Sequence, residues 1–79
     1  MAIEASDLDN WFSYHKPLGD QPERYAKIRD AARAFAEVIV RNTPSCADQT
    51  AAIRKLRETV MAANLSIACN EVDHEGKLL

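Results

Sequence analysis

Two long apolar runs, separated by a proline turn, restrict this chain to a small set of folds. The first run, "AARAFAEVIV", carries only Arg33 and Glu37 as charges, and the second, "VMAANLSIAC", carries none. From Ile53 to Ile67, apolar residues recur in steps of three and four, which is typical of one face of a helix. They are Ile53, Leu56, Val60, Ala63 and Ile67. The sequence therefore predicts an all-α fold, a hairpin of two long helices.

Signals for the start and end of each helix set its bounds. Asp20 is a suitable N-cap for helix one, and Glu23 follows at capping-box distance. Pro44 ends that helix, because the residue before a proline avoids the α region. Ser45 is then the expected N-cap of helix two. We expect helix one over residues 20–42, where Ile28, Ala32, Phe35 and Ile39 follow the helical spacing, and helix two over residues 45–71.

The remaining residues flank the hairpin within a single domain of 79 residues. Residues 1–10 form an acidic N-terminal segment. Residues 11–19 form a segment that we call the clamp. Residues 72–79 mix charges with a glycine and are expected to form a frayed tail.

The apolar surface is larger than one hairpin can cover. Met61, Leu65 and Ala68 form a second apolar line on helix two, away from the first. A helix that is apolar nearly all round is normally buried, so we predict a compact, obligate homo-oligomer. Asn64 and Ser66 in the same region need partners if buried, either across helices or on a ligand.

Composition and cysteine spacing exclude several classes of protein. The net charge of −2 argues against a general DNA- or RNA-binding protein. No apolar run is long enough for a transmembrane helix, and the acidic start is unlike a signal peptide, so a cytoplasmic protein is expected. Cys46 and Cys69 lie 23 positions apart, about 35 Å along one helix, which excludes a disulfide between them. Neither His15 nor His74 completes a zinc spacing with them, and no metal or cofactor is predicted.

The sequence contains no recognisable catalytic set. His15 and Tyr14 are able to act as acid or base, but no second member of a catalytic constellation is apparent. The two glycines form neither a phosphate-binding loop nor a dinucleotide fingerprint. We therefore predict that the protein is not an enzyme.

The stretch "WFSYHKPLGDQPERY" is the best candidate for a binding site. It holds four of the five aromatic residues, and aromatic faces stack on nucleobases while Lys and Arg contact phosphate. Two structural alternatives remain open. The aromatic side chains of Trp11, Phe12 and Tyr14 would also suit a plug at the open end of a helix bundle, and the cations would suit a solvated helix face.

The motifs "YHKPLGDQPERYAKIR" and "RKLRETVMAANLSIACNE" resemble those of small phage proteins that defeat CBASS immunity by sequestering cyclic oligonucleotide signals. The hairpin domain of these anti-CBASS sponges is shared with a class of anti-Thoeris sponges. The similarity covers residues 11–71, and the acidic N-terminus and the tail carry no family signal. The resemblance implies a homohexamer in the cytoplasm of an infected bacterial host, which binds cyclic nucleotides between protomers without cleaving them.

Matched residue by residue, the resemblance implies a cyclic dinucleotide pocket made by the clamp and the start of helix one. Tyr14 would stack on a base with His15 and Lys16 beside it, Pro17 and Gly19 would shape the turn, Arg24 and Lys27 would face phosphate, and Trp11 would offer a second stacking face.

Some members of the family also bind cyclic trinucleotides at separate sites. The candidates here are Arg54, Arg57 and Asn70 on helix two, although an ordinary surface ion pair is the favoured interpretation of either arginine. The alternative to a sponge is a small oligomeric helical adaptor or regulatory module that contacts protein or DNA. That alternative explains the apolar helices but not the clustering of aromatic residues in the clamp.

Overall fold

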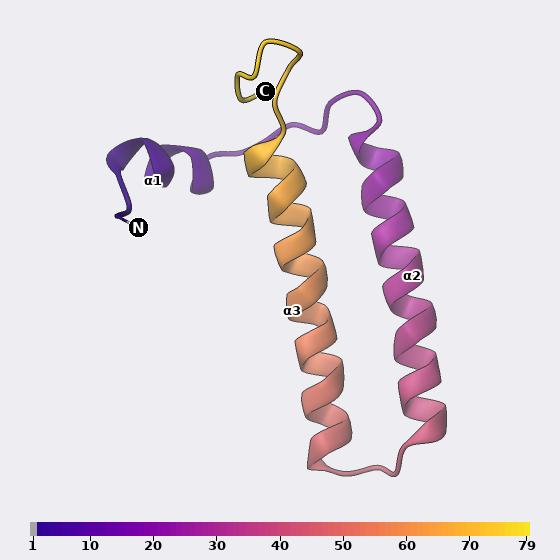
Figure 1. Ribbon diagram of the computed structural model, residues 1–79. Coiled ribbons are helices and arrows are strands. Elements are labelled where there is room, and N and C mark those ends of the chain that lie inside the picture. Colours follow the sequence, from indigo (N-terminus) through magenta and orange to yellow (C-terminus); the bar gives the residue numbers. More distant parts are fainter. Residues whose placement is uncertain (1) are drawn as a thin grey trace.

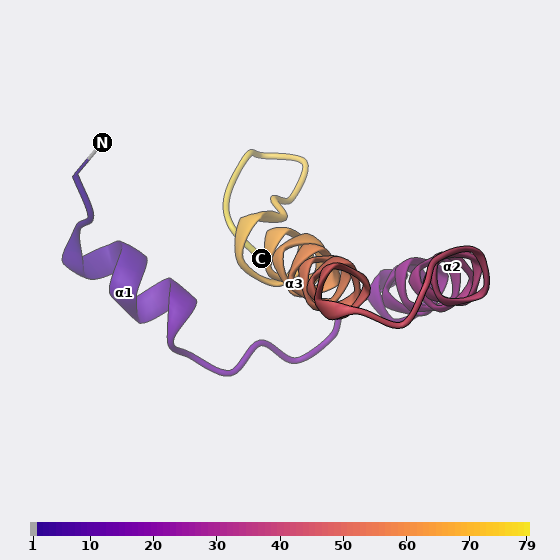
Figure 2. The same ribbon diagram turned by 90° about the horizontal axis from the view of Figure 1, so that it is seen from below.

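The computed structural model describes residues 2–79 and contains three helices in that range. They are α1 (Ala5–Trp11), α2 (Gln21–Asn42) and α3 (Ala47–Asn70). α2 and α3 lie side by side and run antiparallel, and α1 lies on the opposite side of α3 from α2 (Figures 1 and 2). The all-α prediction and the helical hairpin are therefore confirmed.

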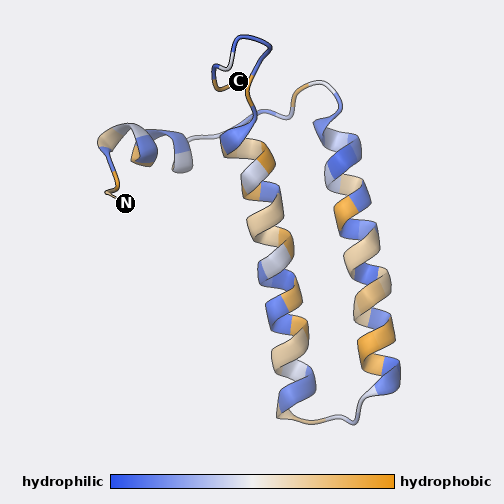
Figure 3. Ribbon diagram, in the orientation of Figure 1, coloured by the Kyte–Doolittle hydropathy of each residue, from blue (hydrophilic) through white to orange (hydrophobic). Residues whose placement is uncertain are grey.

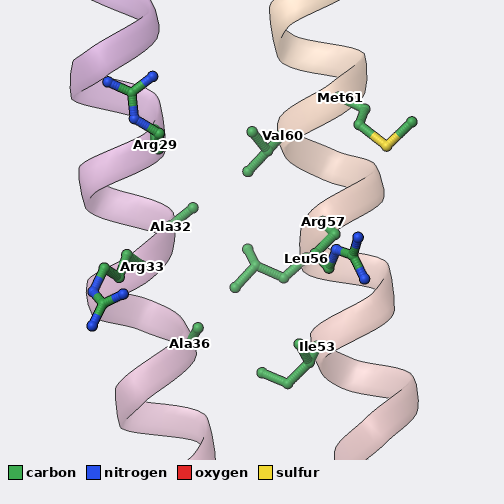
Figure 4. A pocket seen from close by; sticks show the side chains of 9 residues that line it. All are labelled: Arg29, Ala32, Arg33, Ala36, Ile53, Leu56, Arg57, Val60 and Met61. Carbon is green, nitrogen blue, oxygen red and sulfur yellow. The ribbon is translucent and has the colours of Figure 1, made fainter.

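Small and branched side chains form the contact between α2 and α3. Figure 4 shows Ile53, Leu56 and Val60 of α3 pointing towards α2, and Ala32 and Ala36 of α2 pointing towards α3. Phe35, one of the apolar residues at helical spacing on α2, is 56% exposed. Ala36 takes the position facing α3, where a methyl group lets the two helices approach closely and a phenyl ring would not.

The predicted N-cap position of α2 is confirmed, and that of α3 is wrong. Asp20 is at the N-cap position of α2, but its side chain bonds no backbone N–H there. Its ψ of 5° lies outside the extended region in which a cap side chain reaches the first turn, and its carboxylate accepts from Arg24 Nε instead, at 3.2 Å. Ser45 is not the N-cap of α3. The turn needs one residue more to reverse the chain, and Cys46 precedes the helix in an extended conformation.

The acidic N-terminal segment is helical, which the sequence analysis did not predict. The backbone N–H of Glu4 donates to Asp7 Oδ2 at 2.8 Å, and this bond supports the first turn of α1. None of its seven residues is buried. α1 therefore projects from the hairpin as an arm with most of its surface free (Figure 2).

The tail is not frayed as expected but folds into a tight turn. Val72 and Leu78 form an antiparallel bridge, and Asp73 Oδ1 accepts from the backbone N–H groups of Glu75 and Lys77 at 2.8 and 3.0 Å. Gly76 has a φ of 81°, which is open to glycine and strained for most other residues. The turn leads the chain back, so that the Leu79 N–H donates to the Glu71 carbonyl at 3.0 Å.

A single chain exposes more surface than a globular protein of its mass. Its accessible area is 6499 Å², against roughly 4,800 Å² for a compact monomer of 8.8 kDa. Its radius of gyration is 16.1 Å, against about 12 Å for a compact domain of this length. Hydrophobic residues occur along the whole of both long helices (Figure 3). Met61 and Leu65, on the second apolar line, are 62% and 55% exposed.

Candidate ligand-binding site

The clamp crosses the end of the hairpin at which α2 begins and α3 ends (Figure 1). It reaches α2 through a tight turn, in which Gln21 N donates to the Leu18 carbonyl at 2.9 Å and Leu18 N donates to Gln21 Oε1 at 2.9 Å. Gly19 lies within this turn with a φ of 54°, in the left-handed region. The turn therefore needs a glycine at this position, in agreement with the turn-shaping role that the resemblance implied for Gly19.

A polar cluster of Gln21, Arg24 and Glu71 fastens the start of α2 to the end of α3. Gln21 is only 5% exposed, and its Nε2 donates to Glu71 Oε1 at 3.3 Å. Arg24 Nη2 donates to the same carboxylate oxygen. The hydrogen bonds from Arg24 and Gln21 lower the pKa of Glu71, and the bond to Glu71 raises the pKa of Arg24.

This cluster bears on the phosphate contact predicted for Arg24. Its guanidinium group already contacts two carboxylates, those of Glu71 and Asp20. Its positive charge is therefore largely compensated within the chain. The phosphate contact stays a prediction, and Arg24 has a structural role in addition.

A second set of contacts attaches the clamp to α3. Asn10 Nδ2 donates to the carbonyl of Cys69 at 2.8 Å, and His15 Nε2 contacts the carbonyl of Asn10 at 2.6 Å. A carbonyl oxygen only accepts, so Nε2 carries the proton in this contact. The Sγ of Cys69 lies 3.9 Å from the same nitrogen. Cys69 is buried beneath the clamp, and with Ile67 it forms the buried apolar core of the described residues.

Three predicted site residues meet at one small cavity. Tyr14, His15 and Lys16 line it from the clamp, and Ala68 lines it from α3. Its volume is about 200 Å³, below the roughly 300–1,000 Å³ of typical ligand pockets. The ring of Tyr14 is 85% exposed. The clamp thus presents an aromatic face and a lysine beside an incomplete pocket.

Trp11 lies at a different cavity, on the other side of the clamp. This cavity of about 650 Å³ lies between the end of α1 and α3, and Asn70 lines it as well. Phe12, Leu65 and Cys69 are among the apolar residues that line it. Within one chain, Trp11 is therefore not placed at the same cavity as Tyr14.

The other predicted residues are dispersed. Lys27 is exposed on α2 and lines neither of these cavities. Arg54 and Arg57 line a shallow cavity of about 280 Å³ with Gln49 and Thr50. Arg57 and Asn70 are 13 residues apart on α3, about 20 Å along the helix axis. One chain therefore does not bring the three trinucleotide candidates together.

Residues 2–79 contain no cluster of three or more His, Cys, Asp or Glu side chains suited to a metal ion. In the same range, no helix combines the length and apolar character needed to cross a bilayer.

Comparison with models of protein families identifies the family of this chain. A family model described as "Acb2/Tad1, hairpin domain" matches residues 4–68. The chain belongs to the Acb2/Tad1 hairpin family. The resemblance predicted from the clamp and helix-two motifs is therefore confirmed. No curated protein and no solved structure matches the chain in the corresponding comparisons.

Membership in the Acb2/Tad1 family indicates the function of a phage cyclic-nucleotide sponge. The matched range begins at the arm, so α1 belongs to the hairpin domain although the sequence analysis found no family signal in residues 1–10. The range ends at Ala68, before Cys69 and Glu71.

Sequence reasoning missed the residues that position the clamp of this Acb2/Tad1 member. Gln21 was noted only as part of a motif. Asn10 was noted only as part of the acidic N-terminal segment, and Glu71 only as the acidic residue at the end of helix two. A signal for Gln21 was present, since a glutamine in the first turn after a Gly-Asp pair is able to bond back to the preceding turn. No local pattern indicates the contacts of Asn10 and Glu71, because their partners are 59 and 47–50 residues away.

Proposed function

We propose that this protein binds cyclic dinucleotides and sequesters them without cleavage, and that a phage uses it to block CBASS-type immunity in the cytoplasm of its bacterial host. The observation that carries the proposal is the clamp of a hairpin-family member, in which an exposed Tyr14 ring stands beside Lys16. An aromatic face with an adjacent cation suits a nucleobase joined to a phosphate.

The size of the clamp cavity supports a pocket shared between chains. A volume of about 200 Å³ is small for a dinucleotide. An exposed aromatic ring at its edge leaves the second face of the ring free for a base or for a neighbouring protomer. We infer that a second chain completes the pocket, in keeping with sites formed between protomers.

The exposed surface supports an oligomer, for which we propose a homohexamer. The chain exposes about 1,700 Å² more than a compact monomer of its mass. Much of the excess is apolar, on Phe35 and Val38 of α2 and on Met61 and Leu65 of α3. An area of this size is comparable to that buried in specific protein interfaces.

The proposal requires that the protein bind the cyclic nucleotide without cleaving it. A sponge requires tight binding, many sites per particle and an intact ligand. The clamp offers stacking and charge, and its histidine holds a backbone carbonyl through Nε2. The trinucleotide site at Arg54, Arg57 and Asn70 stays a prediction, and it requires at least two chains because of the spacing along α3.

The direct test is titration of purified protein with cyclic dinucleotides, followed by denaturation and mass analysis of the released ligand. We expect saturable binding and recovery of the unchanged cyclic nucleotide. Recovery of a linear or hydrolysed product would show that the protein is a nuclease. Absence of binding to all cyclic di- and trinucleotides, together with capture of DNA or of one host protein, would favour the adaptor alternative.

Tyr14→Ala tests the stacking role within that assay. Loss of one base stack costs about 1–3 kcal/mol, which raises the dissociation constant roughly 5- to 150-fold. Tyr14→Phe is the matched control, because it retains the ring and should bind within about threefold of the wild type. Because Tyr14 is exposed, both variants should keep the wild-type helicity. Equal binding by Tyr14→Ala and wild type would remove Tyr14 from the site.

A further inference from the structure

Part-way along the hairpin, a groove between α2 and α3 has an apolar floor and cationic walls. Ala32, Ala36, Ile53, Leu56 and Val60 form its floor, and its volume is about 340 Å³. Arg29 and Arg33 line the wall on α2, and Arg57 lines the wall on α3 (Figure 4). Arg33 has a partner in Glu37 at 3.5 Å. Among residues 2–79, Arg29 and Arg57 have no carboxylate within ion-pair distance.

The arm α1 has the complementary pattern. Leu8 and Trp11 occur at i and i+3 and share one face of the helix, and the C-cap residue Phe12 follows at i+4. All three are exposed, but Trp11 and Phe12 also border the cavity between α1 and α3 of their own chain, so Leu8 is the residue of this face left for a contact elsewhere. Asp7 and Asp9 stand about 100° to either side of Leu8 around the helix axis. The apolar stripe of the arm is thus bordered by one carboxylate on each side, as the floor of the groove is bordered by arginines on both walls.

The arm cannot reach the groove of its own chain. Asn10 is bonded to the carbonyl of Cys69, and His15 is bonded to Asn10, so the end of α1 is held at the end of α3. Arg57 lies 12 residues before Cys69, about 18 Å down the helix. α1 also lies on the far side of α3 from α2 (Figures 1 and 2). Any contact between arm and groove must therefore join two chains.

We propose that the groove between α2 and α3 is the docking site for the α1 arm of a second copy of this chain. Leu8 of the arm lies over the apolar floor, and Asp7 and Asp9 face the arginines of the two walls. Charge favours this occupant over another copy of the same groove, because two grooves face to face would bring like charges together. The proposal concerns assembly and does not depend on nucleotide binding.

Disulfide trapping tests the contact without altering its charges. Leu8→Cys is made in one preparation and Met61→Cys, at the edge of the groove, in a second that is labelled with ¹⁵N. Both carry Cys46→Ser, which removes the exposed native thiol. After mixing and mild oxidation, mass spectrometry should find a disulfide that joins a labelled chain to an unlabelled one. The matched control is Lys55→Cys, which is exposed on α3 and does not line the groove. Equal or faster trapping at Lys55→Cys, or no trapping at Met61→Cys, would overturn the proposal.

Paired charge reversal tests the electrostatic part. Arg29→Glu with Arg57→Glu should weaken assembly roughly tenfold in sedimentation at low salt, and Asp7→Arg with Asp9→Arg should do the same. The protein that carries all four changes should recover to within about threefold of wild type, and Lys55→Glu should have no such effect. Circular dichroism checks the helicity of each variant. A fourfold variant that assembles no better than either double variant would refute the pairing.

Nucleotide titration of the same variants separates this proposal from the proposed function. If Arg29→Glu with Arg57→Glu leaves assembly unchanged but abolishes binding of a cyclic dinucleotide, the groove is a nucleotide site and the docking proposal is wrong. If the variants change assembly in the expected way while no cyclic nucleotide binds even to the wild type, the docking proposal stands and the sponge function fails.

Discussion

Gln21→Ala should loosen the attachment of the clamp to the hairpin and lower the stability of the whole chain. Among residues 2–79, Gln21 is the one buried polar or charged residue, and its amide joins two segments far apart in sequence. Oε1 accepts the Leu18 N–H at 2.9 Å, and Nε2 donates to Glu71 Oε1 at 3.3 Å. Alanine keeps the helix and removes both bonds.

The expected loss follows from these two contacts. A typical hydrogen bond contributes a net of about 1 kcal/mol, and an unsatisfied group left behind costs about 1–3 kcal/mol. The bond from Gln21 to Glu71 is long, and the carboxylate of Glu71 is partly exposed. The loss of this bond should therefore cost an amount at the low end of that range. The free energy of unfolding should therefore fall by about 2 kcal/mol, which corresponds to roughly 8–16 °C in Tm for a chain of this size.

Thermal denaturation followed by circular dichroism at one fixed protein concentration measures the effect, since assembly makes Tm concentration-dependent. Gln49→Ala is the matched control at the opposite end of the hairpin. Its Nε2 donates to Val40 and Thr43 at 3.1 to 3.4 Å, and Gln49 is not buried. Gln49→Ala should therefore lower the free energy of unfolding by no more than about 0.5 kcal/mol. If Gln21→Ala and Gln49→Ala have the same Tm, the buried amide of Gln21 does not anchor the clamp and the reasoning is wrong.

Three further predictions test charge and assembly. Lys27→Glu replaces an attraction for phosphate by a repulsion, so titration calorimetry should show weaker cyclic dinucleotide binding, with the larger loss at low salt. Leu65→Glu should lower the mass measured by sedimentation, because a carboxylate in an apolar interface costs several kcal/mol. Its helicity should stay unchanged, because Leu65 is exposed in one chain. An unchanged mass would place Leu65 outside any interface. The pKa of Glu71 is lower in the folded chain than its ordinary value of 4.5, so its contribution is present above about pH 4.5 and is lost as the pH falls through the lowered pKa. Denaturation midpoints should therefore fall more between about pH 6 and pH 3 for the wild type than for Glu71→Gln, and parallel curves would contradict this assignment.

The hairpin could be predicted because its signals are local and periodic. The steps of three and four from Ile53 to Ile67 define the face of α3 that meets α2, and Pro44 marks the turn between the helices. Spacing alone does not decide whether Phe35 or Ala36 faces α3, because both suit a helical spacing from Ala32. Only the closeness of the two helices decides in favour of the methyl group. The arm was missed because seven residues with three acids carry too little periodicity to indicate a helix.

The candidate site could be predicted in its residues but not in its arrangement. Aromatic and basic residue types marked the clamp, and Tyr14, His15 and Lys16 do share a cavity. The separation of Trp11 from Tyr14 could not be inferred, because it depends on how Asn10 and His15 attach the clamp to the end of α3. Contacts that span more than 50 residues leave no trace in local spacing.

The position of Glu71 has a consequence for how the clamp would hold an anion. Arg24 carries the charge best suited to phosphate, but two carboxylates already compensate it. On the clamp and the first two turns of α2, the cations without an ion pair among residues 2–79 are Lys16 and Lys27. Two ammonium groups match the two phosphates of a cyclic dinucleotide in number, and they are exposed to screening by salt. Under the proposed function, selectivity among such ligands would then come chiefly from stacking on Tyr14 and from the neighbouring chain proposed to complete the pocket, since charge alone distinguishes only how many phosphates a ligand carries.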